Sequence, residues 1–110
     1  MTKLMQLEVT LESDTPRAHR IVLPPSARLP KLHHAIQDAM GWKGEGMHVF
    51  QRDGRLIGNS DRGGDLFVED ERTVRVDDLL TEPDDEVTYE YCGEGRPPVS
   101  IRFEAFVRPG

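Results

Sequence analysis

The chain of 110 residues has little of what marks a secreted, membrane or disulfide-bonded protein. Its single cysteine, Cys92, has no partner for an internal disulfide or a C-x-x-C metal motif. No apolar run is long enough to cross a bilayer. Residues 1–12 lack the apolar centre of a secretory signal. These absences predict a cytoplasmic protein that does not bind to membranes.

Motifs for catalysis and metal binding are also missing. The chain has four histidines, which are His19, His33, His34 and His48. None of them forms an H-x-x-x-H or H-x-x-E pair, spacings that would place two metal ligands close together. There is no G-x-S-x-G sequence around a nucleophilic serine. We therefore predict no metal and no cofactor, and we favour a protein that is not an enzyme.

What the chain does contain is typical of a folded globular protein, with 31% charged and 36% hydrophobic residues. It shows no internal repeat, low-complexity tract or interdomain linker. A chain of this length suits one compact domain with a modest core. We therefore predict a single domain over residues 1–110.

Apolar residues that alternate with polar ones predict strands at residues 4–11 and 99–107. Two further strands are predicted at residues 17–23, where Pro24 and Pro25 cannot continue a ladder, and at residues 87–92. In the last strand, one face is expected to carry Val99, Ile101, Phe103, Ala105 and Val107. Asp53 and Gly54 predict the turn of a hairpin over residues 47–58. Weaker patterns predict a short strand at 66–68, and a brief strand from Thr73 that gives way to a helical turn.

A helix is predicted over residues 29–40, because its apolar residues recur on one arc at helical spacing. Pro30 suits the first turn, where its missing N–H is not needed, and Gly41 is the expected left-handed end. In that kind of ending, the next residue packs back on the last turn. Trp42 should therefore cover Ile36.

The order of these elements predicts the fold class. We expect an α+β domain with a mainly antiparallel β-sheet and one principal helix packed on a face of the sheet. The helix must bury its apolar arc against that face. The chain begins strand, strand, helix, and this β-β-α start makes a β-grasp-like order possible.

Three polar residues are candidates for a site between helix and sheet. His33 lies at the edge of the buried arc, Gln37 lies one turn further along the same edge, and His48 is in the following strand. Imidazole and amide groups can both donate and accept hydrogen bonds, so the three could form a closed polar seam. The alternative is an enzyme centre or a two-histidine metal site, which would need a further ligand. His34 points away from the arc and is expected in solvent.

Charge is distributed unevenly along the chain. The net charge of −6 disfavours binding to nucleic acid, because contacts with phosphates need a basic surface. Residues 15–37, however, contain no Asp or Glu. The basic residues of this segment that could form a patch are Arg17, Arg20, Arg28 and Lys31. The patch is a candidate surface for a protein partner or a nucleic acid.

The stretch LPKLHHAIQDAMGW, followed by GMHVF, resembles the Ri-plasmid open-reading-frame-three-like family, also described as mobile-element passenger (TnpR-like) proteins. The family pattern is close to L-x-x-L-H-x-x-I-Q-x-A-M-G-W, a short gap and H-L-H-x-F. The matching positions are Leu29, Leu32, His33, Ile36, Gln37, Ala39, Met40, Gly41, Trp42, His48 and Phe50. An LEVTLE strand, VDDLL and YEY add to the agreement. The resemblance implies a compact α+β fold and no particular activity.

The chain departs from the family pattern in two places. The first histidine of H-L-H is Gly46 here. The turn after YEY, typically DFGDGW followed shortly by histidine, reads CGEGRPP instead. A site that relatives build from those residues would be incomplete here. We therefore favour a small non-enzymatic interaction or accessory module of plasmids or mobile elements over a nucleic-acid accessory protein, an enzyme or a metal-binding protein.

Overall fold

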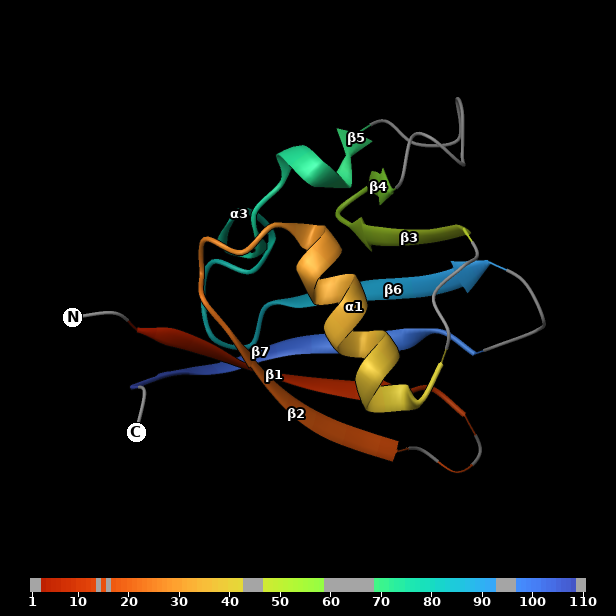
Figure 1. The fold of residues 1–110 in the computed structure, drawn as a ribbon, viewed down its shortest axis with the longest axis horizontal. Helices are drawn as coiled ribbons and strands as arrows, with labels where there is room; N and C mark the ends of the chain where they lie inside the picture. The colour runs from red at the N-terminus through yellow and green to blue at the C-terminus, as the bar shows by residue number, and fades with distance from the viewer. Residues whose placement is uncertain are drawn as a thin grey trace.

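The computed structural model describes residues 3–13, 15, 17–42, 47–58, 69–92 and 97–108. Seven strands of this part of the chain form one sheet in the order β2-β1-β7-β6-β3-β4-β5 (Figure 1). The strands are β1 (Leu4–Leu11), β2 (Arg17–Leu23), β3 (Met47–Arg52), β4 (Arg55–Gly58), β5 (Glu69–Asp70), β6 (Glu86–Cys92) and β7 (Val99–Val107). Neighbouring strands run antiparallel except for β4 and β5, which are parallel.

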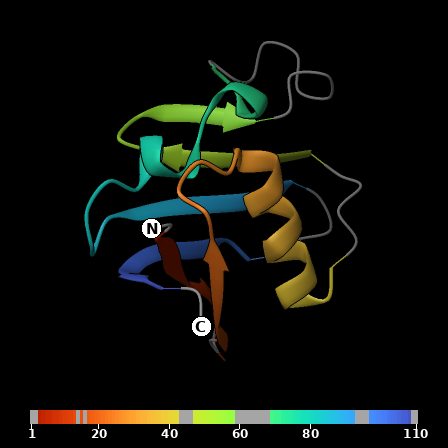
Figure 2. The same ribbon diagram turned by 60° about the vertical axis from the view of Figure 1, so that its left-hand side comes forward.

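The helices are the 3-10 helix η2 (Glu71–Thr73) and the α-helices α1 (Leu29–Met40) and α3 (Val76–Leu79). Helix α1 lies across one face of the sheet (Figures 1 and 2). The predicted α+β class and the mainly antiparallel sheet are confirmed. The single helix is not confirmed, because α3 is a second α-helix. A β-grasp-like order is not confirmed either, because β1 and β7 pair antiparallel where a β-grasp has parallel strands.

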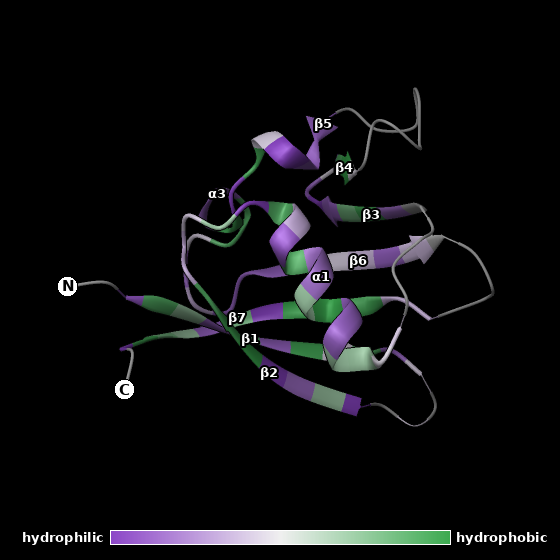
Figure 3. Cartoon of the chain, viewed as in Figure 1, coloured by the Kyte–Doolittle hydropathy of each residue, from purple (hydrophilic) through white to green (hydrophobic). Residues whose placement is uncertain are grey.

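One hydrophobic core fills the space between α1 and the sheet. Along β1, Met5, Leu7 and Val9 are buried and the residues between them are partly exposed, as expected for a strand with one covered face. Figure 3 shows the same alternation of hydrophobic and hydrophilic residues along the strands. Helix α1 contributes to this core Leu29, Leu32 and Ile36. No helix within the described ranges has the length and hydropathy of a membrane span.

Helix α1 begins and ends as predicted. No side chain caps its start, where a proline fills a position that needs no backbone N–H. At its end, Gly41 is left-handed with φ of 70°. The N–H of Trp42 donates to the carbonyl oxygen of Gln37 at 2.9 Å. Trp42 is only partly buried and packs at the edge of the core beside Tyr91.

The predicted hairpin is confirmed. Strands β3 and β4 pair antiparallel with Arg52 opposite Arg55. The connecting residues Asp53 and Gly54 have φ of 49° and 81°. Positive φ at both central residues defines the type I′ turn, whose twist matches that of the flanking strands. The short strand predicted at 66–68 lies outside the described residues.

The brief strand predicted from Thr73 is wrong. Residues 71–73 form η2 instead, and the chain then makes an isolated bridge between Arg75 and Arg28. The backbone after η2 hydrogen-bonds to the loop that precedes α1, so it pairs with a loop and not with a strand. The helical turn predicted next is helix α3.

Strand β7 does not keep the predicted alternation to its end. Its register with β1 shifts after Phe103, where Glu104 is the extra residue of a β-bulge. One extra residue moves the following side chains to the opposite face of the sheet. Phe106, and not Ala105, therefore stands opposite Met5 on the helix side. Its side chain remains 45% exposed.

In the connection between α3 and β6, the carboxylate of Asp85 should make the stability of the protein depend on pH. Asp85 accepts hydrogen bonds from the backbone N–H groups of Glu82 and Thr81. These bonds, with the Thr81 hydroxyl and Arg52, lower the pKa of Asp85 from 3.8 to about 2. A lowered pKa means that the carboxylate stabilises the fold above the unfolded-state value, and that this contribution is lost as the pH falls toward the folded-state value.

We therefore expect Asp85→Asn, which keeps the shape but cannot ionise, to unfold at a lower urea concentration than wild type at neutral pH. The difference between the two proteins should shrink as the pH is lowered through the interval between 3.8 and about 2. Urea denaturation midpoints across this interval measure it. If the difference between the two urea midpoints stays constant as the pH is lowered, the Asp85 carboxylate does not accept the hydrogen bonds from Thr81 and Glu82 in solution.

Candidate functional site

Helix α1 and strand β3 bring together the three polar residues that the sequence singled out. His33 and Gln37 lie one turn apart on the buried side of α1, and His48 lies on β3. The rings of His33 and His48 stack, with centroids 3.7 Å apart and planes inclined by 10°. None of the three residues is more than 4% exposed. They are therefore closed off from solvent.

Tyr89 of β6 joins His33 to Gln37. Its hydroxyl oxygen lies 2.8 Å from Nδ1 of His33, and Nε2 of Gln37 donates to it at 2.7 Å. An amide nitrogen can only donate, so the phenol oxygen accepts this hydrogen bond. The phenol proton can then be donated to Nδ1 of a neutral His33. Tyr89 itself is completely buried, so these bonds form inside the core.

Glu71 of η2 joins the group through His48. Its Oε1 lies 2.5 Å from Nε2 of His48, and both side chains are almost wholly buried. The imidazole N–H therefore donates a charge-assisted hydrogen bond to the carboxylate. A carboxylate removed from water in this way depends on such a partner. We refer to His33, Gln37, His48, Glu71 and Tyr89 as the polar cluster.

Sequence reasoning did not find two members of the polar cluster. Tyr89 gave a usable signal, because it alternates with Val87 in a predicted strand and so belongs to the buried face. Glu71 gave no such signal, because it lies between the strand predicted at 66–68 and the strand predicted from Thr73. It meets His48 only because β3 and η2 pack against each other in the folded chain. Its burial depends on contacts between segments that the sequence pattern does not relate.

Aromatic packing supports the polar cluster. Phe50 meets the His48 ring edge-on, with centroids 6.1 Å apart, and lies 5.1 Å from the Tyr89 ring. Two buried atoms, Oε1 of Gln37 and Nδ1 of His48, have no hydrogen-bond partner among the described residues. An unpaired buried polar atom costs roughly 1–3 kcal/mol. The surrounding packing must therefore help to hold these side chains in place.

The stacked geometry does not suit the two-histidine metal site considered as an alternative. An imidazole binds a metal ion through a nitrogen lone pair that lies in the plane of its ring. The planes of His33 and His48 are nearly parallel, one above the other. Lone pairs in two such planes cannot converge on one ion. In the part of the chain that is described, no three His, Cys, Asp or Glu side chains form a metal-ligand group.

The four residues of the candidate basic patch do not form one surface. Arg17 and Arg20 lie on β2 at positions that face opposite sides of the sheet. Arg28 and Lys31 lie at the start of α1. The charge of Arg20 is compensated, because its Nε donates to Oε1 of Glu104 at 2.9 Å. This bond is the main cause of the lowered pKa of Glu104.

Other residues considered in the sequence take no part in the polar cluster. His34 is exposed on α1, as expected, with its ring 5.2 Å from that of His33. Of the two departures from the family pattern, Gly46 lies outside the described residues, and so do residues 93–96 of the turn from Cys92 to Pro98.

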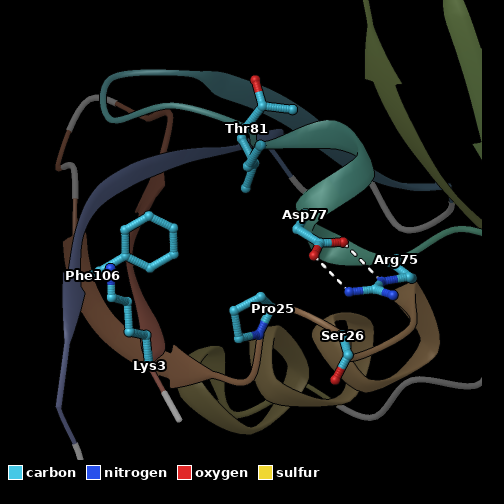
Figure 4. Close-up of a pocket in the computed structure, with 8 residues that line it drawn as sticks. Lys3, Pro25, Ser26, Arg75, Asp77, Thr81 and Phe106 are labelled. Carbon is cyan, nitrogen blue, oxygen red and sulfur yellow. Dashed lines mark hydrogen bonds and ion pairs between the residues drawn. The ribbon is translucent and has the colours of Figure 1, made fainter. Parts of the chain in front are cut away.

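An open pocket of about 560 Å³ lies between α3 and the end of β7 (Figure 4). Its lining includes the apolar Pro25, Leu80 and Phe106 and the charged Lys3, Arg75 and Asp77. No sequence pattern predicted it, because its walls come from segments far apart in the chain and depend on the β-bulge that turns Phe106. We call it the α3 pocket.

Comparison with known proteins places the chain in a family. Residues 3–105 match the family model of the plasmid pRiA4b ORF-3-like protein. The chain belongs to this family. A comparison with curated proteins found no match. The family resemblance expected from the helix motif is therefore confirmed.

A solved structure shares the fold of this chain. It is the crystal structure of a protein of unknown function from Methanosarcina mazei Go1, with a TM-score of 0.78 and 23% sequence identity. The similarity covers 97% of this chain and 63% of the other, so our chain spans less than two thirds of that protein. Identity at this level relates the two folds and carries no statement about activity.

The motif that first suggested the pRiA4b ORF-3-like family coincides with the polar cluster. His33, Gln37, His48 and Phe50 are all positions of that motif, and Tyr89 belongs to the YEY segment. In the structure these residues contact one another in the core. In this chain, the residues of the family pattern are thus residues that pack together in the core.

Proposed function

We propose that this chain is a small non-enzymatic interaction or accessory module, formed by a single domain over residues 1–110. The observation that carries the proposal is the closure of the polar cluster, which holds the candidate catalytic side chains. The name of the family mentions a plasmid and so supports a link to plasmids; a link to mobile elements is part of our proposal.

Closure matters because a general acid or base must come within hydrogen-bonding distance of its substrate. In the polar cluster, His33 bonds to Tyr89 and stacks on His48, which in turn bonds to Glu71. The polar residues that α1, β3 and η2 contribute are each at most 5% exposed. A substrate would have to open the core to reach them, which favours a structural role for the cluster.

An interaction module needs an accessible surface, and the α3 pocket supplies one. Large exposed apolar residues are few on the described surface, namely Val22 and Phe106, each 45% exposed. Phe106 lines the α3 pocket. An exposed apolar group inside a concavity is typical of a site that a partner covers.

A nucleic-acid accessory role has less support. The net charge of −6 opposes the approach of phosphates. Arg20 is already paired with Glu104, and Arg17 faces the other side of the sheet. The candidate basic patch therefore lacks the continuous positive surface that binding to a phosphate backbone requires.

A thermal-shift screen of small acids, bases and neutral molecules tests the proposed function. We expect some compounds to raise the melting temperature of the wild-type protein, since ligands that bind only the folded state stabilise it. The same compounds should not stabilise Phe106→Ala, and they should be recovered chemically unchanged.

The matched control is Val22→Ala, which removes a side chain of equal exposure from the opposite face of the sheet. It should respond to the compounds as wild type does. A compound that the wild-type protein converts into a product, but His33→Ala does not, would identify an enzyme and overturn the proposal.

A further inference from the structure

We propose that the α3 pocket binds a small organic anion in which a single carboxylate is attached to a planar apolar ring. This inference rests on the proposed function, because it names the ligand class of the same open surface. Three features of the pocket carry it: a fixed apolar wall, one uncompensated cation, and a volume that fits a small molecule (Figure 4).

The apolar wall is built from Pro25, Leu80 and Phe106. The ring of Phe106 packs edge-on against the buried ring of Phe103, with centroids 5.0 Å apart and planes at 84°. This contact holds Phe106 in place although its side chain is 45% exposed. A ring held in this way offers a surface on which a second planar ring can stack.

The charges of the pocket favour an anion. Arg75 and Asp77 already satisfy each other through two hydrogen bonds of 2.9 and 2.7 Å. Nζ of Lys3 lies over the Phe106 ring, 5.4 Å from its centroid, so the cation and the apolar wall adjoin each other. No described carboxylate is within ion-pair distance of Lys3. Two basic side chains and one acidic side chain give the lining a net charge of +1 in a protein of net charge −6.

Size and charge together limit the ligand. The volume of about 560 Å³ falls within the range of about 300–1,000 Å³ that is usual for small-molecule sites. One uncompensated cation matches one negative charge, which favours a carboxylate over a multiply charged phosphate.

The test is a titration of ¹⁵N-labelled full-length protein, followed by NMR chemical shifts, with three probes. The probes are 3-phenylpropionate, the neutral 3-phenylpropanamide, and propionate, which has the charge without the ring. We expect 3-phenylpropionate to shift the amide signals of Lys3, Thr81 and Phe106. The neutral 3-phenylpropanamide should bind about threefold more weakly than 3-phenylpropionate, since an exposed charge pair contributes little more than a threefold gain in affinity.

Two variants locate the interaction. Lys3→Met should weaken 3-phenylpropionate about threefold and leave 3-phenylpropanamide unchanged. Phe106→Ala should weaken both ring-bearing probes about tenfold, because the stacking partner is removed. Val22→Ala, the matched control, should bind all probes as wild type does. Melting temperatures confirm that each variant is folded.

Two results would overturn the ligand class. Equal affinity for 3-phenylpropionate and 3-phenylpropanamide would show that charge is not recognised. Binding of 3-phenylpropionate that moves signals of β3 and η2, and is unaffected by Phe106→Ala, would place the site elsewhere. If 3-phenylpropionate fails to bind while compounds from the thermal-shift screen still depend on Phe106, the ligand class is wrong and the proposed function stands. If those compounds do not depend on Phe106 either, both proposals fail.

Discussion

Glu71→Ala is expected to lower the free energy of unfolding by about 3–5 kcal/mol, because it leaves a buried hydrogen-bond partner unsatisfied and removes buried side-chain packing. The substitution leaves the N–H of His48 Nε2 without its acceptor inside the core. It also removes side-chain packing between η2 and β3. Urea denaturation followed by circular dichroism at neutral pH measures the loss.

The double variant His48→Phe/Glu71→Leu is the control for this prediction. It replaces both polar partners by apolar side chains of similar size, a change that is often neutral or stabilising at buried pairs. We expect it to recover most of the stability that Glu71→Ala loses. If Glu71→Ala unfolds at the same urea concentration as wild type, Glu71 is not a buried member of the polar cluster.

Tyr89→Phe is expected to destabilise the protein by about 2–4 kcal/mol, although it removes one oxygen atom. Two groups lose their hydrogen bond to that oxygen, Nδ1 of His33 and Nε2 of Gln37. Each buried polar group left without a partner costs about 1–3 kcal/mol. The same urea experiment provides the measurement.

Tyr91→Phe is the matched control, because Tyr91 lies two residues further along β6 and is only partly buried. Where water can replace a lost hydrogen bond, the cost should not exceed about 1 kcal/mol. Equal losses for the two variants would mean that the Tyr89 hydroxyl has no special role in the core.

The elements that the sequence predicted well are those whose burial repeats with a regular period. Strand β1 has its predicted bounds because its apolar side chains alternate with polar ones, and β2 ends as predicted, directly before Pro24 and Pro25. Helix α1 ends where Gly41 adopts the left-handed conformation that glycine tolerates best. In each case, the local pattern reports directly which face of the element is covered.

The polar cluster shows what such patterns leave out. Helical spacing relates His33 to Gln37, but the stacking of His33 on His48 depends on the position of β3 relative to α1. That position follows from the strand order, in which β3 pairs with β6 and not with its neighbour in sequence, β2. Glu71 enters the cluster for the same reason, through a contact between segments distant in the chain.

The α3 pocket could not be predicted from the sequence because of one extra residue in β7, Glu104. Strict alternation along β7 would place Ala105 on the helix side and turn Phe106 away from it. The β-bulge at Glu104 reverses this arrangement. The carboxylate of Glu104 accepts hydrogen bonds from Gln6 of β1 and from Arg20 of β2, the strand beyond it. These interactions exist only once the sheet has formed.

Elemental analysis of protein purified without a histidine tag tests most directly whether the polar cluster is a closed part of the core. We predict that no transition metal is bound in stoichiometric amount, because the stacked rings of His33 and His48 cannot share an ion. Metal content is measured by inductively coupled plasma mass spectrometry on the wild type and on the His33→Ala/His48→Ala double variant. Stoichiometric zinc or another transition metal in the wild type, lost in the double variant, would contradict this prediction and make the cluster a metal site.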